Sequence, residues 1–356
     1  MLTHFTILII ILFIISIFKN KLEALKYTMF ILFFYLAIRY DYGTDYLNYY
    51  ELFTDSTEYE TESREVLFWF FFRLFNKYTY FIIFHTFLCC LTFYFFIKEY
   101  INKKYYILFI LIFMLHPGLM YCMITAMRSA LAAIFFLITC HFFYIKKRNV
   151  ICFCLGTIVA SLFHTSAIVL LILPFAESFI KRSTKYLIFI YILLLILSGI
   201  FINQIATIAT NQFEIFNKYD NYVENGYMNI PSLGVIILRG AYLIPIFYML
   251  KTYKNEGITE PVKKNFTISF FYFFILFLGL DFQNRYTIIL FPYVIAALSY
   301  TLQTNKKSFS KITIYSTTLI IISYMNYIMY KIYMSDLTIQ GNFINYQTIF
   351  SLSFLP

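Results

Sequence analysis

Long apolar runs, separated by short polar segments, follow one another along the chain. The recurring run length is about 17–20 residues, enough for an α-helix to cross a hydrocarbon core about 30 Å thick. The pattern predicts an all-α polytopic integral membrane protein, with about ten transmembrane helices in a single transmembrane domain over 1–356. The expected spans lie near 2–18, 24–38, 79–97, 105–121, 127–145, 186–203, 232–250, 265–281, 284–303 and 311–331.

Lysine and arginine concentrate in every second connecting segment. By the positive-inside rule these segments face the cytoplasm. Both chain termini are then expected outside, together with the long outer loops 39–78 and 204–231. The basic residues that define the inner side are Lys19, Lys21, Lys26, Lys98, Lys103, Lys104, Lys146, Lys147, Arg148, Lys251, Lys254, Lys263, Lys264, Lys306, Lys307 and Lys311.

The stretch 149–178 is too short for two crossings, yet another basic cluster follows it at Lys181, Arg182 and Lys185. A single crossing would place that cluster outside. We therefore expect a re-entrant hairpin that enters and leaves on the cytoplasmic side, with 162–166 at its tip. A helix of about 12 residues rises about 18 Å, which would carry the tip beyond the bilayer midplane. The alternative is one long tilted span and a local exception to the charge rule.

A second short apolar segment, Val66–Phe75, follows an acidic stretch of the first outer loop. Asn76 and Lys77 end it too soon for a crossing. We expect an outer interfacial helix here, with Trp69, the only tryptophan, at the level of the lipid headgroups.

Composition excludes an ordinary soluble domain. Charged residues make up 13% of the chain and hydrophobic residues 61%, whereas soluble domains carry roughly 25% charged residues. The net charge of +10 reflects the inner loops and forms no exposed basic face, so a nucleic-acid partner is not expected. The six cysteines lack the spacing of a zinc site or a disulfide framework. The first apolar run lacks a basic leading region and a cleavage site, which favours a retained anchor.

The most unusual polar stretch is Arg39–Tyr46, at the outer edge of the second span. Ionisable residues at the edge of a bilayer are costly unless they pair or bind something. Here an arginine and the two aspartates Asp41 and Asp45 alternate with tyrosines. This composition suits hydroxyl-rich, anionic ligands, because sugars stack on aromatic faces and carboxylates accept hydrogen bonds from hydroxyls. An ordinary solvated loop beside an aromatic belt is the alternative.

Four arginines lie within or at the ends of apolar spans on the expected outer side, against the orientation rule and at a cost in lipid. They are Arg39, Arg128, Arg239 and Arg285. A planar, permanently charged guanidinium binds phosphate oxygens through two parallel hydrogen bonds. The group therefore indicates a lipid-linked phosphate or pyrophosphate. Snorkelling, or pairing with Asp41 or Asp281, is the alternative.

His164 differs from the other histidines because it sits with threonine and serine at the expected hairpin tip. A neutral imidazole within reach of a sugar hydroxyl can act as a general base. A structural role is equally open, and Asp41 and Asp45 are rival bases. The chain contains no glycine-rich phosphate loop, zinc-binding helix or nucleophile elbow. It also has no soluble domain for a nucleotide-sugar, which favours a donor delivered through the membrane.

Four short blocks, in this order and spacing, resemble the EpsG family of Wzy-type polysaccharide polymerases. The blocks are Arg39 with Gly43–Tyr46 and Tyr49, then Arg128–Ala132, Phe163–Ala167 and Asn284–Tyr286. The resemblance extends along nearly the whole chain. Only the acidic stretch Glu58–Glu65 and the tail after Lys331 fall outside it.

The resemblance implies a multi-pass enzyme of the bacterial cytoplasmic (inner) membrane that polymerises oligosaccharide repeat units on the outer face. The growing chain on undecaprenyl pyrophosphate would be transferred to a sugar hydroxyl of a new lipid-linked repeat unit. The implied partners are the undecaprenyl-pyrophosphate-linked oligosaccharide and membrane lipid, with a chain-length regulator and a flippase as further candidates. No metal or other cofactor is required, since fixed cations can stabilise the leaving group.

The residue assignment under this hypothesis has two groups. The substrate-binding residues are Arg39, Arg128, Arg239, Arg285, Tyr46 and Tyr49, and the catalytic residues are His164, Asp41 and Asp45. Among them, Arg128, Arg239 and Arg285 would bind the pyrophosphate. Arg39 and the two aspartates would organise or activate the acceptor, and His164 would be the base or an orienting group.

Three other functions share some of these features. An O-antigen ligase would use the same donor, so the arginines do not separate it from a polymerase. A flippase or transporter of lipid-linked oligosaccharide predicts internal repeats and polar residues on both faces, neither of which the sequence shows clearly. An acyltransferase of surface glycans would place its functional polar residues near the inner side.

Overall fold

The computed structural model describes residues 7, 10–11, 13–14, 17–43, 45–55, 65–197, 233–277, 285–305, 310–321, 323 and 347–348. The described part is helical apart from one short pair of antiparallel strands, β1 (Arg39–Tyr40) and β2 (Gln347–Thr348). The expected span 2–18, the outer loop 204–231 and Asp281 fall largely or wholly outside it.

The helices of the first half follow one another at short intervals. They are α2 (Lys21–Ala37), α3 (Tyr46–Asp55), α5 (Val66–Arg73), α6 (Tyr78–Tyr100), the 3₁₀ turn η1 (Lys103–Tyr105), α7 (Tyr106–Leu115), α8 (Pro117–Ile124), α9 (Met127–Thr139) and the π-helical η2 (Cys140–Lys146).

The second half contains α10 (Val150–Ser161), the 3₁₀ helix η3 (Thr165–Ile172), α11 (Leu173–Ser183), a helix at Leu187–Leu197, α14 (Leu233–Ala241), α15 (Leu243–Tyr253), α16 (Glu260–Phe277), α17 (Arg285–Thr304) and a helix over 310–321.

Three helical segments of the described residues are long and apolar enough to cross a membrane: α6, Met127–Lys146 and α17. A fourth span is possible if Lys103–Leu115 and Gly118–Ile124 count as one, bent by 73°. The chain is therefore a helical membrane protein, while the expected number of about ten spans stays a prediction.

The bend between α7 and α8 has a clear chemical cause. Pro117 has no backbone N–H, and the residue before a proline avoids the helical region. His116 accordingly adopts φ −80° and ψ 113°, and its Nδ1 accepts a hydrogen bond from the amide of Gly118 at 3.1 Å. The helix over the expected span 105–121 is therefore broken at this point. The expected span 232–250 is likewise interrupted, between α14 and α15.

The expected hairpin is confirmed as a reversal of the chain. Helix α10 begins where the Asn149 side chain accepts a hydrogen bond from the Cys152 amide, it ends at Ser161, and η3 returns along it. The two ends of the hairpin close on each other, because the Tyr144 hydroxyl donates to Glu177 Oε2 at 2.6 Å. The chain therefore reverses direction here, while its entry and exit on the cytoplasmic side stay a prediction.

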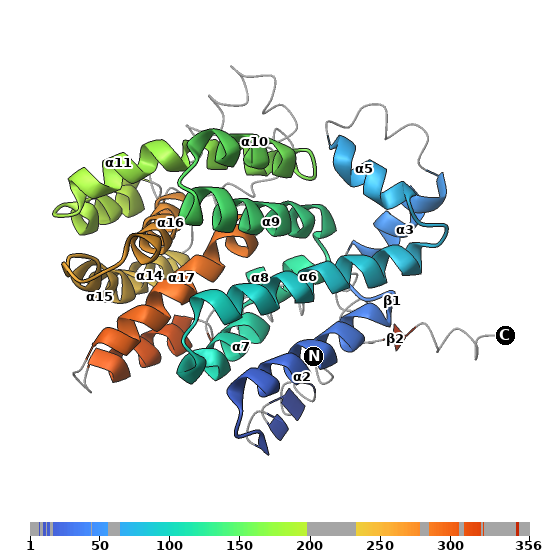
Figure 1. Ribbon diagram of the computed structural model, residues 1–356, viewed down its shortest axis with the longest axis horizontal. Helices are drawn as coiled ribbons and strands as arrows, with labels where there is room; N and C mark the ends of the chain where they lie inside the picture. Colours follow the sequence, from blue (N-terminus) through green and yellow to red (C-terminus); the bar gives the residue numbers. More distant parts are fainter. Residues whose placement is uncertain are drawn as a thin grey trace.

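The polar tip and the basic root of the hairpin lie at opposite ends of the molecule. In Figure 1 the turn after α10 lies beside α5, at the end that also holds α3, β1 and β2, whereas α11 extends toward the other end. The amides of Leu67 and Phe68 both donate to the carbonyl of Leu162, at 3.1 and 3.4 Å. The start of α5 is thus attached directly to the hairpin turn.

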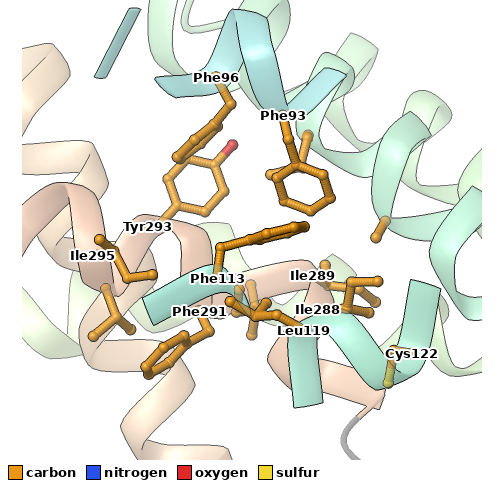
Figure 2. Packing of buried hydrophobic residues seen from close by; sticks show 14 of the residues in the cluster. Phe93, Phe96, Phe113, Leu119, Cys122, Ile288, Ile289, Phe291, Tyr293 and Ile295 are labelled. Atoms are coloured by element: carbon orange, nitrogen blue, oxygen red, sulfur yellow. The ribbon is translucent and has the colours of Figure 1, made fainter. Parts of the chain in front are cut away.

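Aromatic packing holds the long helices together behind this end. Phe93 of α6 lies 4.8 Å from Phe113 of α7 between ring centroids, and Phe96 lies 5.1 Å from Tyr293 of α17. Figure 2 shows these rings above Ile288, Ile289 and other apolar side chains. This core fixes α17 relative to α6, and with it the first turn of α17.

The short helix expected at 66–75 is present as α5, with Trp69 on its buried face. Its side chain is buried and packs against Phe68 and Phe72, with centroid distances of 5.5 and 5.8 Å. Val66 and Phe70 are the exposed apolar residues of this helix. Trp69 therefore packs inside the protein, and its expected level at the lipid headgroups stays a prediction.

Candidate active site

Four segments that are distant in sequence bring their polar side chains together at the hairpin turn. They contribute Tyr49 from α3, Glu65 directly before α5, Arg128 from the first turn of α9, and His164 from the turn between α10 and η3. The described structure thus joins three residues expected at a site to one that was not expected there.

Glu65 is the centre of this cluster, and both of its carboxylate oxygens are used. Oε1 lies 2.5 Å from Nδ1 of His164 and accepts a hydrogen bond from the backbone amide of Thr165 at 3.2 Å. Oε2 lies 2.8 Å from Nη1 of Arg128. Burial by itself would raise the pKa of Glu65, but the hydrogen bonds and the positive charge of Arg128 outweigh it and lower the pKa. The carboxylate is therefore ionised at neutral pH.

The proton between Glu65 and His164 can be placed from chemistry. A carboxylate only accepts hydrogen bonds, so Nδ1 of the imidazole must donate. In a neutral imidazole the lone pair then lies on Nε2. No described residue makes a hydrogen bond to Nε2. Because Nδ1 is engaged by Glu65, Nε2 is the ring nitrogen that remains able to take up a proton. The His164 side chain is otherwise enclosed, since the residue is only 6% exposed.

Arg128 is held on one edge and accessible on the other. Its Nε donates to the Tyr49 hydroxyl at 3.3 Å, and its Cζ lies 5.8 and 6.0 Å from the ring centroids of Tyr49 and Phe68. The side chain is nevertheless 40% exposed, and Nη2 has no hydrogen-bond partner among the described residues. Arg128 can therefore bind an anion without leaving Glu65.

The first turn of α17 lies next to the same turn. The Tyr286 hydroxyl donates to the carbonyl of Ser166 at 3.3 Å. The positive charges of Arg285 and Arg128 both act on the imidazole of His164. Two of the four arginines singled out in the sequence are thus close to the expected base.

Arg39 occupies a different environment from Arg128. It is 1% exposed, and its guanidinium donates to the carbonyl of Leu36 at 2.8 Å, to Thr86 Oγ1 at 3.3 Å and to the carbonyl of Ile124 at 3.5 Å. These contacts tie the end of α2 to α6 and α8. The described contacts of Arg39 are therefore those of a residue that organises the protein interior.

The stretch after Arg39, with Asp41, Asp45 and Tyr46, lies at the same end of the molecule as α3 and forms what we call the rim. Asp41 has a left-handed backbone with φ 42°, and the charge of Asp45 reaches Tyr49. Tyr46 is buried and packs edge-on against Tyr78, with centroids 5.2 Å apart. Gly43 has φ 112°, and a Cβ there would lie 2.8 Å from the side chain of Ile124. The close contact between this loop and α8 accordingly requires glycine.

Arg239, the last of the expected site residues, lies in α14 and is partly buried. Helix α14 packs against α15. The expected role of Arg239 in binding pyrophosphate stays a prediction.

The sequence model of the EpsG family matches residues 25–348. The match includes Tyr49, Glu65, Arg128, His164 and Arg285. The chain belongs to the EpsG family. No curated protein and no solved structure matches it. Membership in the EpsG family supports, in general terms, the role of a membrane polysaccharide polymerase.

A second polar cluster of this EpsG-family chain lies at the root of the hairpin. Glu177 accepts from Lys181 at 2.7 Å, and it also pairs with Lys264 of α16 and with the Tyr144 hydroxyl. The Lys264 ammonium lies 4.1 Å from the centroid of the Tyr144 ring. These contacts join η2, α11 and α16, and they fix the end of the hairpin opposite to His164.

Sequence reasoning missed Glu65 and the amide of Thr165. Glu65 is the last of several acidic residues in the first outer loop, and nothing in its immediate neighbourhood separates it from the others. The one available signal was its position directly before the apolar run of α5, because a carboxylate there enters a buried environment.

Proposed function

We propose that this EpsG-family chain polymerises undecaprenyl-pyrophosphate-linked oligosaccharide repeat units at the outer face of the bacterial inner membrane. The observation that carries the proposal is the pairing of His164, with an available Nε2, and Arg128, with an accessible guanidinium edge. A base and a fixed cation are the two groups that glycosyl transfer from a lipid pyrophosphate needs.

In the proposed reaction a sugar hydroxyl of the acceptor attacks the anomeric carbon of the donor. The new carbon–oxygen bond forms as the bond to the pyrophosphate oxygen breaks, and the leaving pyrophosphate keeps the electron pair. The hydroxyl proton moves to Nε2 of His164. Arg128 and Arg285 stabilise the charge that develops on the leaving group, because positioned cations need little reorganisation during the reaction.

The other expected residues have supporting places in this scheme. Tyr49 fixes Arg128 through its hydroxyl. Asp41 and Asp45 lie on the neighbouring rim, where they would contact the acceptor. The buried Tyr46 would support the rim from inside, and Arg39 would hold it in place from beneath. Arg239 would bind pyrophosphate from α14. In the proposed reaction, fixed cations stabilise the leaving group in place of a metal ion.

The outer-face assignment rests on the distribution of charge. The basic root of the hairpin, with Lys181 and Lys264, lies opposite to the turn that carries His164. If basic segments face the cytoplasm, the Glu65 cluster faces outward. The same rule places both termini outside and is consistent with about ten spans. A chain-length regulator and a flippase that delivers the repeat unit are the expected partners.

The test is a gel of surface polysaccharide, whether O-antigen, capsule or exopolysaccharide, from the source bacterium with the gene deleted and then complemented. We expect deletion to reduce the ladder to a single-repeat band. Wild type should restore the ladder, while Arg128→Ala and Arg285→Ala should not, although both should still insert in the membrane. Arg182→Ala is the matched control, because Arg182 is exposed near the root of the hairpin.

The same gel separates the alternatives. Polymer that accumulates on the carrier lipid without reaching its final acceptor would indicate a ligase. An unchanged ladder after deletion would contradict the proposal and would favour transport or acyl transfer. A normal ladder from Arg128→Ala would contradict the assignment of this arginine to the leaving group.

A further inference from the structure

We infer that Glu65 is a positioning residue, which holds His164 in the form that accepts a proton at Nε2 and fixes Arg128 beside it. This inference rests on the proposed function. It concerns a residue outside the motifs that pointed to the family, within the acidic stretch that no motif covers.

The first support is that one carboxylate serves both groups. Oε1 is occupied by Nδ1 of His164 and the Thr165 amide, and Oε2 by Arg128. The planar carboxylate of Glu65 thus sets the distance between the imidazole of His164 and the guanidinium of Arg128. A carboxylate used only for an ion pair would not need to bind the imidazole and the adjacent backbone amide as well.

The second support comes from what Glu65 does not do. It occupies the position before the first residue of α5, yet its side chain makes no capping hydrogen bond to that helix. A side chain at this position commonly accepts from the amides of the first turn. Here the amides of Leu67 and Phe68 donate to the carbonyl of Leu162 instead, and the carboxylate is left for the hairpin turn. Backbone and side chain therefore fix the same turn from the same point of α5.

The third support is the pattern of exposure. Glu65 is 5% exposed and His164 6%, whereas the Arg128 side chain is 40% exposed. A buried carboxylate is costly unless it is paired and hydrogen-bonded. The guanidinium of Arg128 is thus accessible to a ligand, whereas the carboxylate of Glu65 is not. This is the arrangement expected when Glu65 orients His164 and Arg128 and the ligand binds to Arg128.

The consequence for the reaction is electrostatic as well as geometric. When Nε2 accepts the hydroxyl proton, the imidazole becomes positively charged. The ionised Glu65 at Nδ1 stabilises this charge and strengthens the base, since an adjacent carboxylate favours the protonated imidazole. Removing the negative charge should therefore slow the reaction and make His164 a weaker base.

The experiment compares Glu65→Gln, Glu65→Asp and the control Glu51→Gln, which changes an exposed carboxylate of α3 in the same outer loop. The substrate is the single-repeat lipid extracted from the deletion strain. Polymerisation by purified full-length protein in detergent is followed as rate against pH. Thermal unfolding midpoints report folding of each variant.

We expect Glu65→Gln to reduce the rate by about 10²-fold or more, a typical loss when base catalysis is impaired. Its acidic limb should move to lower pH, because the imidazole then protonates less readily. Glu65→Asp should recover part of the rate, and Glu51→Gln should match wild type. A purely structural role would lower the amount of folded protein without moving the limb.

Several results would overturn the inference. Glu65→Gln with a normal rate would do so, as would a reduced rate with an unmoved acidic limb. If Glu65→Gln does not fold, Glu65→Asp decides: a full rate rejects the positioning role, because the shorter side chain cannot hold both His164 and Arg128 in the same places. Failure of the wild-type protein to extend the single-repeat lipid would instead contradict the proposed function, so the two failures are distinguishable.

Discussion

The contact between α9 and α10 depends on the absence of a side chain at Gly156. A Cβ added there would lie 2.5 Å from both Oγ1 and Cγ2 of Thr139, and 3.1 Å from its Cβ. Rotation of the threonine about χ1 cannot relieve both of the first two contacts, because one of its two heavy atoms then still occupies a clashing position, and the contact with its Cβ does not change. Small residues commonly allow close approach of helices in membranes, so Gly156→Ala forces the two helices apart.

The expected cost of Gly156→Ala is about 1–3 kcal/mol, the usual range for overpacking a well-packed core. Thr139→Ala removes the two clashing atoms and should restore much of the loss. The coupling between the two substitutions should be about 1–2 kcal/mol, as for residues in direct contact. Gly257→Ala is the matched control, because a Cβ there meets nothing within 4 Å.

The assay is the thermal midpoint of the purified protein in detergent, measured for the single variants and for Gly156→Ala combined with Thr139→Ala. We expect Gly156→Ala to be the least stable, the double variant to lie closer to wild type, and Gly257→Ala to be unchanged or slightly more stable. Polymer yield should follow the same order, since α10 carries the turn with His164. Equal midpoints for Gly156→Ala and Gly257→Ala would refute the packing argument.

Two further predictions concern the two carboxylates of the hairpin. Glu177→Gln keeps a partner for Tyr144 but removes the negative charge that pairs with Lys181 and Lys264. It should therefore destabilise the protein by about 2 kcal/mol and lower the thermal midpoint more than Glu23→Gln does. An equal effect of the two substitutions would contradict a role of Glu177 in stabilising the root of the hairpin. The lowered pKa of Glu65 means that its stabilising contribution is present above the ordinary pKa of 4.5 and is lost as pH falls below it. The difference in thermal midpoint between wild type and Glu65→Gln should therefore shrink on acidification below that value, and a difference that grows would contradict the ionised carboxylate.

Much of the helical arrangement could be predicted from sequence because the longest apolar runs have polar ends. The expected spans 24–38 and 79–97 correspond closely to α2 and α6. The reversal of the hairpin also followed from charge, since the positive-inside rule predicts that Lys181 and its neighbours lie on the same side as the other basic segments. The break at His116 and Pro117 had a sequence signal in the proline, which the apolar run around it concealed.

The site was predictable only as a set of residue types. Arg128 and His164 were recognisable because an arginine in an apolar span and a histidine among hydroxyl residues are unusual in lipid. Their common partner was not, because Glu65 and His164 are separated by 99 residues in sequence and meet only when α5 packs against the hairpin turn. Arg39 shows the converse case, in which an unusual residue lies in the protein interior.

The order in which the chain is synthesised has a consequence for this site. Glu65 is synthesised early, His164 follows 99 residues later, and Tyr286 reaches the carbonyl of Ser166 across another 120. Glu65, Arg128 and His164 are all present in a nascent chain that has not yet inserted α17, but Arg285 is not. The candidate base is therefore made long before its second neighbouring cation, and a ribosome that stops before α17 releases a chain that lacks it. Under the proposed function such a chain keeps Arg128 as a binding group for the lipid pyrophosphate, so we expect premature products of this gene to compete for the carrier lipid without extending it.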